Sequence, residues 1–188
     1  MKNRIFEGEL IEKRVIIWEK DSLYLYDEKG FGKPQPEDKP KRLELDLVEA
    51  TYLLEKGKLK IYIKEDGKKK YVDLPFMLEY GAKEMLDFHS AYIVYRDLRE
   101  RGYLVKSGFK FGTIFRVYGR GVKLKRGPKA PHEHTKWIVH PVAEEAAFSL
   151  PEMARAVRLA HNIRATMLWA VVDRENGVTY YQITRVTP

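Results

Sequence analysis

The chain has 188 residues, of which 44% are hydrophobic, enough for a packed core, so disorder is not the default expectation. Lys and Arg number 35 against 27 Asp and Glu, a formal charge of +8 that favours an anionic partner such as nucleic acid. Cysteine is absent, which excludes a disulfide framework and a thiolate zinc site.

Two further absences bear on location. No apolar run approaches the roughly 20 residues that a membrane span needs, and the opening MKNRIFEGEL lacks an apolar signal-peptide core. We therefore expect a cytoplasmic protein with no membrane partner.

The first part of the chain predicts a mixed α/β domain. Alternating apolar and polar residues predict two or three strands between Arg4 and Tyr26. The segment 27–41, with three prolines and two glycines, predicts an exposed loop. A capping box of Asp46 and Glu49 then predicts a short helix, and two alternating segments around Asp66-Gly67 predict a hairpin.

A longer helical stretch follows, from Pro75 to about Gly102, with a break expected near Gly81. Beyond it, YLVKSG, TIFRVYG and KWIVHPV predict strands. A capping box of Ser149 and Glu152 predicts a helix, and MLWAVVD and VTYYQITRV predict two more strands.

The expected fold class is therefore α/β (α+β) with two small mixed domains. We place the N-terminal domain at 1–85, including the exposed loop at 27–41, and the C-terminal domain at 86–188.

A tyrosine and a histidine in basic sequence indicate RNA cleavage. Tyr118 lies in FRVYGRG and His134 in PHEHTKWIVH. A tyrosine can accept a proton from a ribose 2′-hydroxyl, a histidine can donate one to the leaving 5′-oxygen, and a cation can stabilise the phosphate between them. The alternative for Tyr118 is an aromatic side chain packed in a strand. The basic segment between the two residues is either a phosphate contact or an ordinary solvated loop.

His132 and His134 have the spacing of a possible metal pair on a strand. No H-E-x-x-H motif, cysteine or acidic cluster completes such a site, so we expect no metal and no other cofactor.

The helix that begins near Pro151 carries Arg158, His161 and Ala165 at steps of three and four, which predicts that they share one face. An arginine can stack on an unpaired base as well as bind phosphate, so Arg158 and Arg185 are candidates for gripping a bulged nucleotide. The alternative is that each lies on a solvated face.

The chain contains the segments YRDLRERGY-x-VK-x-G-x-KFG, FRVY, HTK, RLAH and VTYYQI. Together they resemble the archaeal tRNA-splicing endonucleases, and the resemblance covers most of the chain. It implies a C-terminal nuclease domain that cuts precursor tRNA at the bulge–helix–bulge of intron–exon junctions without metal. The implied products are a 2′,3′-cyclic phosphate and a 5′-hydroxyl, as for a tRNA-intron lyase.

The resemblance makes Tyr118 the general base and His134 the general acid. The family's catalytic lysine follows RLAH-x-[VI]-[RK], and this chain has Ala165 at that place. Either an engineered change or a naturally weakened subunit explains Ala165. We favour the engineered change because Tyr118 and His134 are intact, and we expect slow cleavage or none. The alternative function is a non-catalytic, RNA-binding structural subunit of the same particle.

The resemblance also implies a four-subunit assembly, made of this chain alone or with a second structural subunit. Asp173 and Glu175 resemble the acidic loop that docks into a neighbouring subunit, although a hairpin turn at Asn176-Gly177 explains the same residues. The proline-rich loop resembles a basic loop that some members of the family add to the N-terminal domain. Its residues Lys33, Lys39 and Lys41 would then contact RNA.

Overall fold

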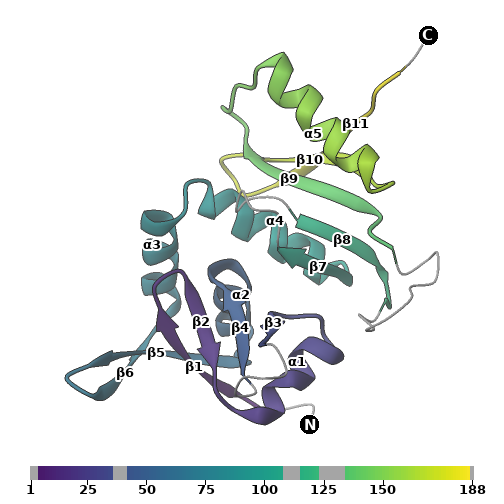
Figure 1. Ribbon diagram of the computed structural model, residues 1–188. Helices are drawn as coiled ribbons and strands as arrows, with labels where there is room; N and C mark the ends of the chain where they lie inside the picture. The colour runs from purple at the N-terminus through teal and green to yellow at the C-terminus, as the bar shows by residue number, and fades with distance from the viewer. Residues whose placement is uncertain (1–3, 36–41, 108–114, 123–133, 187–188) are drawn as a thin grey trace. The chain divides into compact units, whose positions relative to one another are not determined.

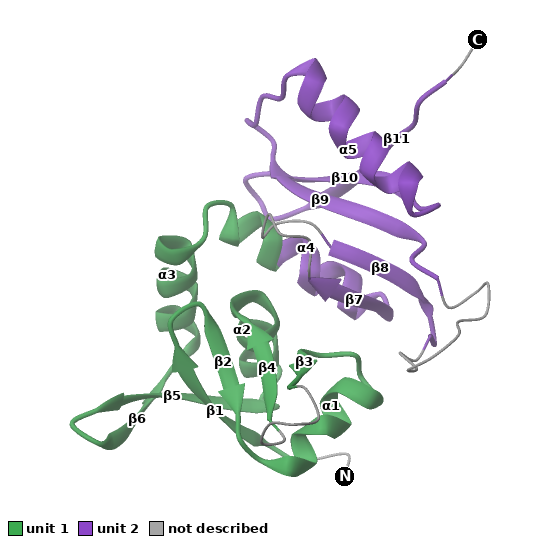
Figure 2. Ribbon diagram, in the orientation of Figure 1, with its two compact units in different colours: residues 1–92 green, residues 93–188 purple. Residues whose placement is uncertain are grey.

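The computed structural model describes residues 4–35, 42–107, 115–122 and 134–186. The chain divides into two compact units, 1–92 and 93–188 (Figure 2). Each unit contains helices and a sheet, which confirms the predicted α+β class with two mixed domains. The division falls between Tyr92 and Ile93, within a helix, and the boundary predicted at residue 85 stays a prediction.

Unit 1 contains one six-stranded sheet (Figure 1). In spatial order its strands are β3 (Lys33–Pro34), β4 (Leu43–Asp46), β2 (Arg14–Ile17), β1 (Phe6–Ile11), β5 (Leu59–Glu65) and β6 (Lys68–Val72). β1 and β5 run parallel, and the other neighbours run antiparallel. A parallel pair needs a crossover, and this one contains helix α2 (Leu47–Glu55).

Helix α2 packs against one face of this sheet, where it contacts β2, β4 and β5. The strand residues with their side chains on this face are apolar and buried, as the alternating sequence pattern predicts. They include Val15, Ile17, Leu43, Leu45, Leu59 and Ile61. The remaining helices of unit 1 are η1 (Lys20–Ser22), α1 (Leu23–Asp27) and α3 (Leu74–Glu84).

The capping box and the hairpin are confirmed. The Glu49 amide donates to Asp46 Oδ1 over 2.8 Å, and the Asp46 amide donates to Glu49 Oε2 over 3.4 Å. Between β5 and β6, Asp66 and Gly67 both have positive φ, at 49° and 75°. This is the backbone of the two-residue turn that Asp-Gly favours, because its twist matches that of the strands.

Two predictions for unit 1 are corrected. The strands expected between Arg4 and Tyr26 end at Ile17, and η1 and α1 follow, because alternation over so few residues does not distinguish a strand from a short helix. The helix break lies at 85–87 rather than at Gly81. A Cβ at Gly81 would lie 2.4 Å from the Phe88 ring, so this glycine allows the next helix to pack closely and does not end α3.

The loop predicted at 27–41 is interrupted by β3, which pairs with β4 through Lys33 and Glu44. Residues 36–41 of that loop lie outside the described residues.

Unit 2 contains a five-stranded sheet (Figure 1). In spatial order its strands are β11 (Val178–Ile183), β10 (Thr166–Val172), β9 (Trp137–Ala143), β8 (Phe115–Arg120) and β7 (Tyr103–Ser107). β9 and β10 run parallel, and the other neighbours run antiparallel.

Two helices pack on opposite faces of this sheet. On one face, Tyr95 of α4 (Phe88–Glu100) contacts Phe115, with ring centroids 5.5 Å apart. On the other face, Ala160 of α5 (Leu150–Asn162) packs with Ile138 and Met167. The predicted capping box of α5 is confirmed, since the Ser149 amide donates to Glu152 over 2.8 Å.

Candidate functional site

Tyr118 lies in β8, on the face of the sheet that α5 covers. Arg116 is paired with Ile138, which contacts α5, and Tyr118 is two residues further along the strand, so both side chains share that face. The Tyr118 side chain is only 2% exposed. Such burial also fits the packed strand aromatic that the sequence left as an alternative.

Two cations lie beside Tyr118 on the same face, and the sequence reasoning missed them. Lys106 of β7 is paired with Arg116 of β8, and Lys106 is only 5% exposed. A lysine this buried is uncommon. The signal was available, because Lys106 interrupts the apolar run YLVKS of a predicted strand.

His134 is exposed and lies just before β9. The amide of Lys136 donates to the carbonyl of Val117 over 2.9 Å, which holds this segment against the strand that carries Tyr118. His132 and most of the basic segment lie outside the described residues. In the part of the chain that the structure describes, no three His, Asp or Glu side chains gather as metal ligands would.

A pocket of about 480 Å³ brings together the other predicted residues. Ala165 lines it with Arg158, His161 and Arg185. Strand register explains the meeting of distant residues: Met167 pairs with Ile183, so Ala165 and Arg185, two residues further out on each strand, come opposite one another. Two threonines that the sequence reasoning did not identify, Thr166 and Thr184, complete the polar lining.

The sequence predicted that Ala165 lies on one face of α5, and this prediction is wrong. The helix ends at Asn162, and Arg164 adopts a left-handed conformation with φ of 56°. The Ala165 amide donates to the Ala160 carbonyl and the Arg164 amide to the His161 carbonyl, each over 2.9 Å. These two hydrogen bonds are those of a Schellman motif at the C-terminus of a helix. It turns the chain back, so that Ala165 meets Arg158 at the pocket.

Asp173 and Glu175 belong to the turn between β10 and β11. Asp173 Oδ1 accepts hydrogen bonds from the amides of Glu175 and Gly177, over 2.9 and 2.7 Å. Asn176 has φ of 65°. The Asp173 carboxylate thus stabilises the turn itself, whereas the Glu175 side chain is exposed.

Of the three lysines in the predicted basic loop, Lys33 is described and exposed in β3. Lys39 and Lys41 lie outside the described residues. Among the helices of the described residues, none is long and apolar enough to cross a membrane.

Comparison with protein families decides the relationship. The tRNA intron endonuclease N-terminal domain matches residues 6–74, and the catalytic C-terminal domain matches residues 88–180, which include Tyr118, His134 and Ala165. The chain belongs to the tRNA intron endonuclease family. The resemblance found in the sequence is therefore confirmed.

The tRNA-splicing endonucleases of three archaea illustrate the similarity. That of Thermococcus onnurineus is 41% identical over 165 residues, 88% of this chain and 86% of its own length. That of Pyrococcus furiosus is 41% identical over 167 residues, with the same coverage. That of Methanococcoides burtonii is 36% identical over 181 residues, 96% of this chain but 48% of its own length. Membership of the family supports tRNA intron cleavage, with precursor tRNA as the substrate.

Proposed function

We propose that this chain is a subunit of a tRNA-splicing endoribonuclease that acts at the bulge–helix–bulge of intron–exon junctions. The observation that carries the proposal is the match of the catalytic domain across residues 88–180, which contains Arg158 and Ala165. These two residues line one pocket together with Arg185, which follows the matched range. A pocket with two guanidinium groups suits an unpaired nucleotide, because arginine both stacks on bases and binds phosphate.

In the proposed reaction, Tyr118 accepts the proton of the ribose 2′-hydroxyl while the 2′-oxygen attacks phosphorus. The bond from phosphorus to the 5′-oxygen breaks, and His134 donates a proton to that oxygen. The products are a 2′,3′-cyclic phosphate and a 5′-hydroxyl, and no metal takes part. The exposed His134 side chain can reach substrate, whereas Tyr118 needs its surroundings to open, since it is only 2% exposed.

Ala165 supplies no cation to the phosphate, so we propose that this form cleaves slowly or not at all. The loss of one group that stabilises transition-state charge costs about 10² to 10³ in rate. The neighbouring Arg164 does not replace the missing cation, because its left-handed backbone belongs to the turn that ends α5.

The test measures the rate at which the Ala165→Lys form cleaves a labelled bulge–helix–bulge RNA in EDTA. In that background, Tyr118→Phe and His134→Gln should each lower the cleavage rate by 10² or more, roughly the contribution of general acid–base catalysis. Arg155→Gln, on the exposed side of α5, is the control and should leave the rate unchanged. Wild-type rates in both Tyr118 and His134 variants would contradict the proposed roles.

The second candidate is a non-catalytic subunit that binds RNA in the same particle. Ala165 favours it, and so does the burial of Tyr118. For this candidate, the Ala165→Lys form binds the RNA but does not cut it in any combination with a partner subunit.

We further propose a four-subunit assembly in which the turn at 173–177 docks into a neighbouring subunit. Because the Asp173 carboxylate accepts two amides within the turn, Glu175 is the residue left to make the docking contact. Lys33 extends the proposed RNA surface into unit 1, with Lys39 and Lys41.

A further inference from the structure

The sheet of unit 1 has a second face, opposite to the one that α2 covers. Strand register assigns side chains to it: Glu9 pairs with both Ile16 and Tyr62, Ile16 pairs with Glu44, and Tyr62 pairs with Tyr71. Directly paired residues project on the same side of a sheet. We call this surface the open face. Its polar and aromatic residues include Glu7, Glu9, Arg14, Trp18, Lys33, Arg42, Glu44, Asp46, Lys60, Tyr62, Lys64, Lys69 and Tyr71.

On the open face, the carboxylates are more buried than the cations that pair with them. Glu9 is 10% exposed, and Lys64, which pairs with it over 2.9 Å, is 54% exposed. Glu44 is 14% exposed, and Arg14, which pairs with it over 2.7 Å, is 63% exposed. An approaching polyanion therefore meets positive charge first, while the carboxylates hold the cations in place.

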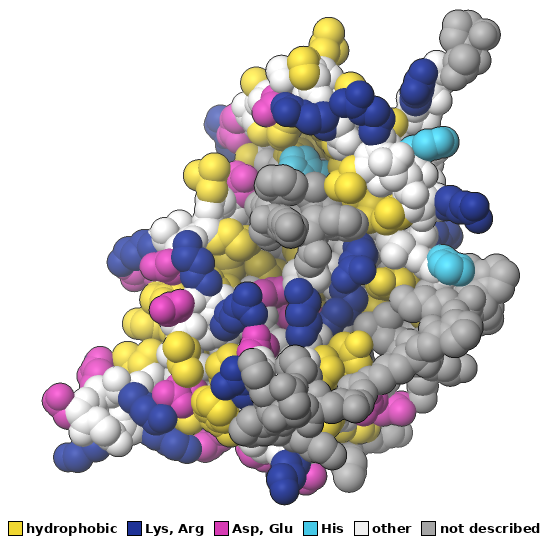
Figure 3. Space-filling view, viewed as in Figure 1, with side chains coloured by type: hydrophobic (Ala, Val, Ile, Leu, Met, Phe, Trp, Pro, Cys, Tyr) yellow, Lys and Arg dark blue, Asp and Glu magenta, His cyan; other side chains and the backbone are white. Residues whose placement is uncertain are grey.

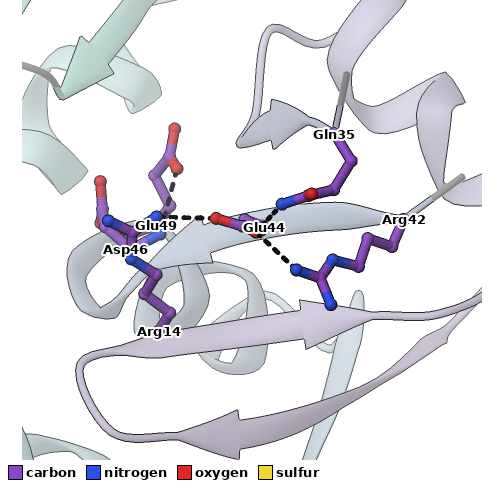
Figure 4. Close-up of polar contacts among 6 residues, drawn as sticks. All are labelled: Arg14, Gln35, Arg42, Glu44, Asp46 and Glu49. Carbon is purple, nitrogen blue, oxygen red and sulfur yellow. Dashed lines mark hydrogen bonds and ion pairs between the residues drawn. The ribbon is translucent and has the colours of Figure 1, made fainter. Parts of the chain in front are cut away.

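Glu44 is the centre of this arrangement. Arg42 approaches its Oε1 atom over 3.2 Å, and the Gln35 side-chain amide donates to the same oxygen. Figure 4 shows Gln35 and Arg42 directed toward the Glu44 carboxylate from one side. Arg14 of β2, Gln35 after β3 and Arg42 before β4 therefore all contact the Glu44 carboxylate. These contacts hold the two guanidinium groups in place on the open face.

Aromatic rings lie among these cations. Trp18 is 45% exposed, its indole N–H donates to Glu9 over 3.1 Å, and the Arg42 guanidinium lies 5.0 Å from its ring centroid. Tyr71 is 51% exposed and meets Tyr62 edge to face at 6.1 Å. Trp18 follows β2 and Tyr71 lies on β6, three strand spacings away, or about 14 Å. Exposed rings at this separation can stack on different bases of one strand.

The open face ends in a hollow of about 840 Å³ beside the β1–β2 turn. Ile11, Ile16 and Tyr80 form its apolar lining. Its polar lining contains three cations and three carboxylates: Lys13, Arg14, Arg42, Glu12, Glu44 and Glu84. Ile11 is 43% exposed and adds apolar surface to the lining of the hollow.

We propose that the open face binds single-stranded RNA. Bases stack on Trp18 and Tyr71, the cations led by Arg14 and Lys64 contact phosphates, and the hollow takes one base. Flat aromatic groups set among cations provide stacking without sequence readout, which is how single strands are bound. Figure 3 shows Lys and Arg side chains interleaved with hydrophobic and acidic ones over unit 1. The proposal rests on the proposed function only for the class of ligand, because the cleavage residues all belong to unit 2.

The experiment measures binding of a labelled single-stranded oligoribonucleotide of about ten residues to the full chain by fluorescence anisotropy. Trp18→Ala, Tyr71→Ala and Lys64→Glu are the test variants. Tyr181→Ala, on β11 of unit 2, is the control for an exposed ring, and Lys83→Glu, on α3, is the control for the same change of net charge. Both control residues are exposed and neither belongs to the open face.

Trp18→Ala and Tyr71→Ala should each weaken binding about tenfold, a typical loss for one stacked base. Lys64→Glu should weaken binding and lower the salt slope by about one. The controls should change affinity by about twofold or less. Equal losses in test and control variants would overturn the proposal. Unchanged RNA binding with an altered particle mass in the test variants would also overturn it, and would indicate a protein interface.

The same variants, made in the Ala165→Lys background, separate this proposal from the proposed function. Failure to bind or cut a bulge–helix–bulge RNA would remove the proposed function and leave the single-strand result standing. Normal cutting with identical single-strand affinity in all variants would remove only the open-face proposal.

Discussion

The hydroxyl of Tyr180 donates a hydrogen bond to Asp97 Oδ2 over 2.7 Å, and this bond joins β11 to α4 across unit 2. The same carboxylate oxygen pairs with Arg101 over 2.7 Å. Burial, followed by the hydrogen bond to Asp97, raises the pKa of Tyr180. The edge strand of the sheet is thus attached to a helix 83 residues earlier in the chain.

This bond predicts an alkaline loss of stability. Folding raises the pKa of Tyr180 above its unfolded value near 10, so above about pH 10 the unfolded chain loses a proton that the folded chain keeps. The contribution to the free energy of unfolding is therefore complete below that pH and falls as the pH rises. Denaturant titrations across this range should show a shallower fall for Tyr180→Phe, with a loss of about 1–2 kcal/mol near neutrality.

Tyr181→Phe is the matched control, because Tyr181 is adjacent and 56% exposed. It should leave both the stability near neutrality and its alkaline slope nearly unchanged. If the two variants behaved alike, the bond to Asp97 would not contribute as described.

The helix end at Arg164 predicts a stabilising substitution. A non-glycine residue in the left-handed region costs about 1 kcal/mol or more, and glycine is the residue that Schellman ends favour at this place. Arg164→Gly should therefore raise the free energy of unfolding by about 1 kcal/mol, measured by urea denaturation. A decrease would mean that the arginine side chain stabilises the fold by more than its backbone costs.

Replacing the buried Glu49 should cause a large loss of stability. Glu49 is 2% exposed, and its carboxylate accepts the Gly32 amide over 3.1 Å as well as closing the capping box with Asp46. Glu49→Ala leaves these amides without that acceptor and should lower the free energy of unfolding by about 2–4 kcal/mol. Glu79→Ala, on the exposed side of α3, should cost less than about 0.5 kcal/mol. A similar loss in both variants would contradict this role.

The turn between β10 and β11 predicts that its two acidic residues behave differently. Glu175→Lys should reduce the mass of the assembly at a given concentration without changing the melting temperature of the dissociated chain, as followed by light scattering and calorimetry. Asp173→Ala should lower that melting temperature, because two amides lose their acceptor. An unchanged mass for Glu175→Lys would argue against docking through this turn.

The sequence predicted most elements because their local signals agree with their packing. β5 and β6 have an Asp-Gly turn, and α2 and α5 have capping boxes, so period and end signals point the same way. Residues 20–27 were misjudged because SLYLY alternates over too short a run, and the burial of Leu25 fits either structure.

The candidate site was predictable in its residues but not in its geometry. Ala165 was expected on α5, and no glycine signals the helix end, because Arg164 occupies the position that glycine usually takes. The meeting of Ala165 with Arg185 depends on the register of β10 and β11, which local sequence does not specify. The sequence marks Lys106 as a cation in an apolar strand, but its place beside Arg116 depends on the pairing of β7 with β8.

The chain belongs to the tRNA intron endonuclease family, and we propose that Ala165 leaves it without one catalytic group. The most direct test is the rate of cleavage of a labelled bulge–helix–bulge RNA in EDTA, comparing the chain with its Ala165→Lys form, each with and without a partner subunit. We predict cleavage at least about 10² faster for the lysine form, with cyclic-phosphate ends. Binding without cutting in every combination would contradict the catalytic account.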